Sequence, residues 1–202
     1  MAQKQSPAYP NFPLEKAIDL ARQVFEKDRK NPIDRAVAVT HMGYAGTSGA
    51  SDKALATLAH YGLLEKAGKG QTQVTQTLVD IIYPDSEEDK RTALLTAGLS
   101  PTVFKMISER FIDGPPSEDA LKAWLFRENF LDRAINPVAR SYLETMQFLE
   151  QSKAFEKGGN ALDIQQDSPD EPNQVRSGEG DDGLAAENAS ESGSKSKREL
   201  MP

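Results

Sequence analysis

The stretch THMGYAGTSGASDKALATLAHYGLLEKAGKGQTQVT, residues 40–75, decides the fold. Glycines interrupt its beginning, and apolar residues then recur at the spacing of an amphipathic helix. Gly62 follows that helix at the position where a C-terminus favours a left-handed residue. Two short runs of strand type, 63–65 and 73–75, flank a turn over 67–71 that contains Gly-Lys-Gly. The stretch therefore predicts a turn, a helix and a β-hairpin in succession.

Helical periodicity continues on both sides of this stretch. Towards the N-terminus it predicts a helix from about Pro13 to Phe25, a short helix that starts at Asn31-Pro32 and carries Ile33, and the helix already described, from Ser48 or Ser51 to Tyr61. Residues 75–83 fit a third strand or a short helix, and their apolar spacing favours the helix. Further helices are predicted over about 85–97, 100–111, from Ser117 onward, and from Asp132 or Asn136 to Gln151.

The junction between helix and hairpin has a distinctive order of residues: Leu55, Leu58, Tyr61-Gly62-Leu63-Leu64-Glu65-Lys66, Gly68, Gly70 and Val74-Thr75. It resembles the recognition helix and wing of the bacterial winged helix-turn-helix superfamily. Residues 9–148 also resemble a family of uncharacterised bacterial proteins with such a domain and an appended helical region. The resemblance implies a mainly α fold, in which a winged helix-turn-helix of three helices and a short β-hairpin precedes a small helical region and a disordered C-terminal tail.

Composition divides the chain into four parts. We expect a flexible N-terminus over 1–12, a winged helix domain over 13–83, a helical region over 84–152 and a disordered acidic tail over 153–202. The tail is poor in apolar residues, so burial cannot offset the entropy of ordering it. From residue 156 onward, 11 acidic and 5 basic residues give −6 of the total charge of −7. The folded part is therefore nearly neutral.

The same composition excludes several classes of function. The chain has no cysteine, and its two histidines lie nineteen residues apart without carboxylates at ligand spacing, so we expect no metal site and no cofactor. We find no nucleophile beside a base in a motif, and therefore expect no enzyme. The N-terminus has no apolar signal region, and no window is apolar enough to span a membrane. We expect a cytoplasmic protein that does not contact membranes.

In winged-helix DNA binders the third helix enters the major groove, and the wing touches the neighbouring backbone or minor groove. The resemblance implies an exposed helix face of Ser51, Asp52, Lys53, Ala56, Thr57 and His60, and a wing surface of Lys66, Lys69, Gln71 and Gln73. The lysines would contact phosphates, and Thr57, His60 and Gln71 would reach base edges or sugars. The DNA-binding residues predicted in this way are Ser51, Lys53, Thr57, His60, Lys66, Lys69 and Gln71.

Charge leaves two hypotheses open. Residues 14–82 contain nine basic and eight acidic residues, a net charge of +1, which is less than the basic patch of a strong nucleic-acid binder. The charged residues Lys27, Arg29, Lys30 and Arg35 would add phosphate contacts or simply be solvated. The first hypothesis is a DNA-binding protein of the kind found among transcription regulators, with residues 84–152 forming a homodimer or docking a partner. The alternative is a protein-interaction adaptor that uses a winged-helix scaffold with little or no DNA binding.

Overall fold

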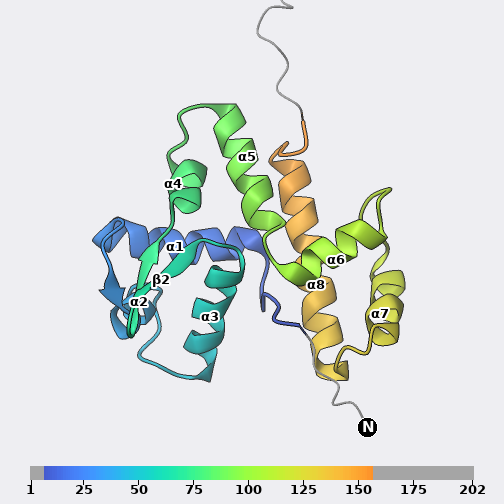
Figure 1. Cartoon of the computed structure of the whole chain (residues 1–202), viewed down its shortest axis with the longest axis horizontal. Coiled ribbons are helices and arrows are strands. Elements are labelled where there is room, and N and C mark those ends of the chain that lie inside the picture. Colours follow the sequence, from blue (N-terminus) through green and yellow to red (C-terminus); the bar gives the residue numbers. More distant parts are fainter. Residues whose placement is uncertain (1–6, 157–202) are drawn as a thin grey trace, which may run out of the picture. The chain divides into compact units, whose positions relative to one another are not determined.

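The structure, a computed structural model, describes residues 7–156, which belong to one compact unit. Within this range the chain is mainly helical, with eight helices and one small antiparallel sheet (Figure 1). The helices are α1 (Leu14–Asp28), α2 (Arg35–His41), α3 (Gly49–His60), α4 (Gln76–Ile82), α5 (Glu87–Gly98), α6 (Thr102–Arg110), α7 (Glu118–Arg127) and α8 (Asp132–Gln151). The strands are β1 (Ile33–Asp34), β2 (Leu64–Gly68) and β3 (Gln71–Val74).

The sheet has the order β1-β3-β2, and both outer strands run antiparallel to β3. The predicted hairpin is present as β2 and β3, and Gly70 turns between them with φ +75°, a conformation that favours glycine. Strand β1 was not predicted: Ile33, expected in a helix, pairs with Thr72 instead. The prediction was wrong here because a two-residue strand carries no periodicity and depends on a partner far away in the sequence.

The structure resolves three assignments that the sequence left open. Helix α3 begins at Gly49 because Ser48 is its N-cap, accepting a hydrogen bond from the Ser51 N–H at 3.3 Å. The ambiguous residues after the hairpin form helix α4, with Thr75 as the N-cap. Helix α8 begins at Asp132 rather than Asn136, so that Pro137 lies inside the helix.

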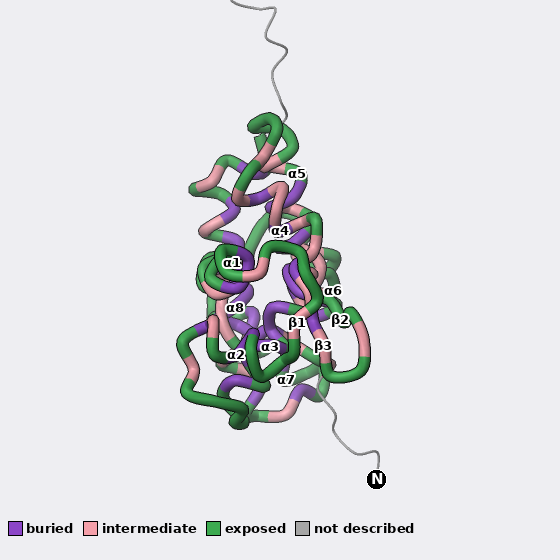
Figure 2. Tube along the Cα trace, turned by 90° about the vertical axis from the view of Figure 1, so that its left-hand side faces the viewer, coloured by how far each residue is buried: buried purple, intermediate pink, exposed green. Residues whose placement is uncertain are grey.

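One hydrophobic core joins the two predicted regions (Figure 2). The ring of Tyr61, at the end of α3, meets the edge of Phe104 on α6 at a centroid distance of 6.0 Å. Phe104 in turn packs against Tyr142 on α8 at 5.3 Å. Helix α1 crosses beneath α4 in Figure 1 and contacts α3 and α8 as well. The predicted boundary between residues 83 and 84 therefore does not coincide with a break in the core.

Both ends of the described chain are held more firmly than predicted. The backbone N–H of Asn11 donates to Thr57 Oγ1 at 3.0 Å, and Tyr61 donates its hydroxyl to the carbonyl of Phe12 at 3.0 Å. The prediction of a flexible N-terminus is thus wrong for these residues, whose partners lie more than forty positions away in the sequence. At the other end Ala154 is buried, so the predicted tail begins too early at residue 153. Residues 157–202 lie outside the described part.

Candidate nucleic-acid interface

The outer face of α3 and the β2–β3 hairpin border an open groove of about 380 Å³. Helix α3 contributes small side chains on this side, chiefly Ala56 and Ala59, which leave the groove unfilled. Arg35, the first residue of α2, also lines it. The hairpin wall includes Leu64, Glu65, Lys66, Gly68, Gly70, Gln71 and Thr72. The groove is thus a channel between a helix and a hairpin, with polar groups along the hairpin side.

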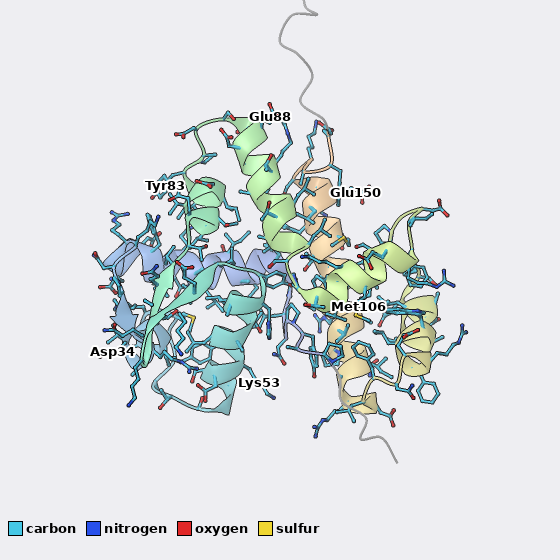
Figure 3. The ribbon with its side chains drawn as sticks, viewed as in Figure 1. Asp34, Lys53, Tyr83, Glu88, Met106 and Glu150 are labelled. Atoms are coloured by element: carbon cyan, nitrogen blue, oxygen red, sulfur yellow. The ribbon has the colours of Figure 1, made fainter. Side chains whose placement is uncertain are left out.

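The structure brings together only some of the predicted contact residues. Lys66 and Gln71 both line the groove. Lys69 is exposed at the hairpin turn, beyond the lining. Lys53 is exposed on the side of α3 away from the strands, as Figure 3 shows, and His60 is half-buried outside the groove. The lysines therefore flank the α3–hairpin surface rather than converge on one point.

Two predicted contact residues do not lie on the exposed face. Ser51 is fully buried, and its hydroxyl accepts from the Ser48 N–H at 2.7 Å. Thr57 is also fully buried, with its hydroxyl donating to the carbonyl of Lys53 at 2.7 Å while accepting from Asn11. The prediction was wrong for both because short polar side chains serve equally well as caps and internal hydrogen-bonding groups. A polar residue on a helix is therefore no proof of an exposed face.

His60 does not add a charge to the surface at neutral pH. Burial lowers the pKa of its imidazole below the ordinary value of 6.5, because desolvation disfavours the charged form. The neutral ring retains one donor and one acceptor nitrogen. His60 can therefore form hydrogen bonds at this surface but not neutralise a phosphate.

The remaining charges on the surface are only partly paired. Arg35 Nη2 lies 3.4 Å from Asp52 Oδ1, and both side chains are more than half exposed. Glu65 accepts a hydrogen bond from Gln73 Nε2 at 2.7 Å. Among residues 7–156 no ion pair involves the predicted phosphate-contacting lysines Lys53, Lys66 and Lys69. These three ammonium groups are available to an anionic ligand.

The basic residues at the end of α1 and the start of α2 lie in different environments. Arg35 alone among them lines the groove. Lys30 donates to Gln76 Oε1 at 2.7 Å, and Arg29 lies over the ring of Phe25 at 5.2 Å. The sequence left the roles of Lys27, Arg29, Lys30 and Arg35 undecided; the structure places Arg35 beside the groove, next to strand β1. The structure thus adds one cation to the predicted surface.

His41 also has a partner that the sequence did not indicate. It ends α2, and its Nε2 lies 2.6 Å from Asp28 Oδ2 at the end of α1. The pair ties two helix C-termini together. Within residues 7–156, no group of three or more histidine or acidic side chains is arranged to hold a metal ion.

Comparison with known proteins finds no match: no family model, no curated protein and no solved structure matches the chain. In the described range, none of the helices combines the length and the apolar character needed to cross a lipid bilayer. The groove and the charges around it are therefore the observations from which a function is inferred.

Proposed function

We propose that residues 14–74 form a winged helix that binds duplex DNA, with α3 entering the major groove and the β2–β3 hairpin acting as the wing. The order α1-β1-α2-α3-β2-β3 and the sheet order β1-β3-β2 support this assignment. The observation that carries the DNA proposal is the open groove between α3 and the hairpin, flanked by lysines that form no ion pair with any other residue of the range 7–156. A helix beside a basic hairpin can place the helix in a groove of the DNA and the hairpin against the phosphates at the edge of that groove.

Phosphate contacts would dominate this binding. Lys53 lies on one flank of α3, and Lys66 and Lys69 lie on the hairpin, so the three can reach phosphates on both sides of the helix. Ala56 and Ala59 permit close approach of the helix to base edges, but they offer no hydrogen bonds. His60 and Gln71 are the polar groups able to reach a base. We therefore infer sequence-tolerant or weakly operator-specific binding without a cofactor or catalytic step.

The affinity should depend strongly on salt. Neutralising three or four phosphates predicts a slope of log K against log salt of roughly −3 to −4. The charge of the surface supports only moderate affinity, because residues 33–74 contain four basic and three acidic residues. Tight binding would then need a second copy of the chain, and residues 84–152 are proposed to provide that contact or to dock a partner.

The experiment is a fluorescence anisotropy titration of the full chain with a labelled random-sequence duplex over a range of salt concentrations. The test variant is K53A/K66A/K69A. The control is K90A/K105A/K122A, which removes the same charge from α5, α6 and α7. We expect the test variant to flatten the salt slope by about three, and the control to change it little. Equal losses in both variants would indicate a nonspecific charge effect and refute the proposed site.

A protein-interaction adaptor is the second candidate. Two observations favour it: the α3–hairpin surface is nearly neutral, and Ile112, between α6 and α7, is 82% exposed. Burial of this side chain against a partner would remove apolar surface from water and so favour association. Light scattering after size exclusion, over a range of concentrations, would detect a homodimer, and I112D should weaken it. An absence of DNA binding at low salt together with dimerisation sensitive to I112D would favour this candidate.

A further inference from the structure

Arg35 is anchored to the wing by its backbone and reaches the groove with its side chain. Its N–H donates to the carbonyl of Gly70 at 3.0 Å, which fixes the start of α2 to the tip of the hairpin. The side chain lines the groove together with Lys66, and it is 53% exposed. A guanidinium held in this place is well suited to a phosphate, because its planar fork matches phosphate oxygens bidentately.

Asp52 occupies the position that such a phosphate would compete for. It lies in the first turn of α3, and its carboxylate contacts the guanidinium of Arg35, which lines the groove. One nitrogen of the guanidinium makes this contact, at 3.4 Å, and the Asp52 side chain is 60% exposed. Exposed pairs of this kind are weak, and a guanidinium has five N–H donors, so an incoming phosphate can displace the carboxylate.

We propose that Arg35 is a fourth phosphate-binding cation of the α3–hairpin surface, beside Lys53, Lys66 and Lys69. We propose further that Asp52 restrains Arg35 by acting as an internal competitor for the guanidinium. This inference rests on the proposed DNA binding. It assigns a role to Asp52, the acidic residue that contacts one of the four cations of this surface. Binding of DNA exchanges the Arg35–Asp52 contact for an Arg35–phosphate contact and leaves Asp52 to solvent.

Removing the competitor should strengthen binding. D52N keeps the shape of the side chain and removes its charge. We expect the affinity for the random duplex to rise about two- to fivefold, the range that corresponds to an exposed ion pair. R35Q should weaken binding and reduce the salt slope by about one.

A charge removed near DNA also raises affinity through the general field, so the test is a double-mutant cycle. If Asp52 acts through Arg35, D52N gives a larger gain in the wild type than in the R35Q background, where only the general field effect remains. E65Q is the matched control, because Glu65 is also exposed on this surface but is bonded to Gln73 rather than to a cation. We expect its effect to be the same in both backgrounds. Equal gains from D52N in both backgrounds would overturn the inference.

The outcomes also separate this inference from the proposed function. Binding that depends on the three lysines but shows no coupling between Arg35 and Asp52 would leave the DNA proposal intact and overturn only the inference. Failure of both the wild type and D52N to bind at low salt would overturn both. Because Asp52 also lies in the first turn of α3, where its charge suits the helix dipole, urea unfolding of each variant confirms that changes in binding are not due to misfolding.

Discussion

Replacing Tyr61 with Phe tests the polar junction that joins the N-terminal segment, α3 and α8. Tyr61 Oη lies 3.0 Å from the Phe12 carbonyl, 3.0 Å from Thr145 Oγ1 and 3.3 Å from Ser141 Oγ. Because a carbonyl only accepts, the tyrosine hydroxyl donates to Phe12, and its oxygen is left to accept from Thr145 or Ser141. Thr145 also accepts from the Leu14 N–H at 3.1 Å, and so caps the first turn of α1. Hydrogen bonds thus connect the Leu14 N–H, through Thr145 and the Tyr61 hydroxyl, to the carbonyl of Phe12.

The cost of the substitution follows from this geometry. Phe keeps the ring packed against Phe104, so the main loss is the hydroxyl. Tyr61 is fully buried, and the Phe12 carbonyl loses its side-chain donor while Thr145 or Ser141 loses an acceptor. Two lost hydrogen bonds, one of them leaving an acceptor without its donor, predict a destabilisation of about 2–3 kcal/mol. A small cavity left at the hydroxyl position would destabilise the fold further.

Urea unfolding of the full chain, followed by circular dichroism, measures this loss as a lower midpoint at an unchanged slope. Y83F is the control: Tyr83 is 61% exposed, and its hydroxyl makes no hydrogen bond with the described residues, so the change should stay within about 0.5 kcal/mol. Equal effects of Y61F and Y83F would refute the reasoning that the hydroxyl network holds the junction together.

Three further predictions concern pH, packing and the buried threonine. Burial raises the pKa of Tyr61 from 10.0 to about 12, so the folded chain keeps a proton that the unfolded chain loses. The contribution of this group to the free energy of unfolding should be fully present below pH 10 and should be lost, by roughly 3 kcal/mol, as the pH rises through 12. Y61F should lack this loss. In G98A the new Cβ would lie 2.7 Å from Leu149 Cδ1, so we expect unfolding to become easier by about 1–3 kcal/mol, whereas G49A, whose Cβ would meet nothing within 4 Å, should be neutral or slightly stabilising. T57V removes the acceptor of the Asn11 N–H and should lower the free energy of unfolding by about 1 kcal/mol without changing the affinity for DNA; a weaker affinity in the folded variant would show that Thr57 contacts DNA after all.

Local signals in the sequence were sufficient for much of the fold. The glycine after the third helix adopts φ +67° at Gly62, as its position predicted. The hairpin formed where strand-type runs flanked Gly-Lys-Gly, and helix α4 formed where apolar spacing favoured it. These features are determined within a few residues, so periodicity and capping residues carry them.

The features that the sequence did not reveal depend on distant partners. Strand β1 exists because Ile33 meets Thr72, and Thr57 is buried because Asn11 lies across it. The hydroxyl of Ser51 likewise takes part in the N-terminal cap of α3 and is buried rather than exposed to a ligand. Exposure was therefore predicted correctly for the long cations of the candidate site and wrongly for the short hydroxyls that turn inward, while DNA contact by any of them stays a prediction.

The most direct measurement of the central claim is a titration of the uniformly ¹⁵N-labelled full chain with a random-sequence duplex, followed by amide chemical shifts at low salt. We predict that the largest shifts cluster in residues 49–60 and 65–71, with Arg35 among them, and that they shrink as salt is added. Shifts confined to residues 87–151, or no shifts at low salt, would contradict DNA binding by the α3–hairpin surface.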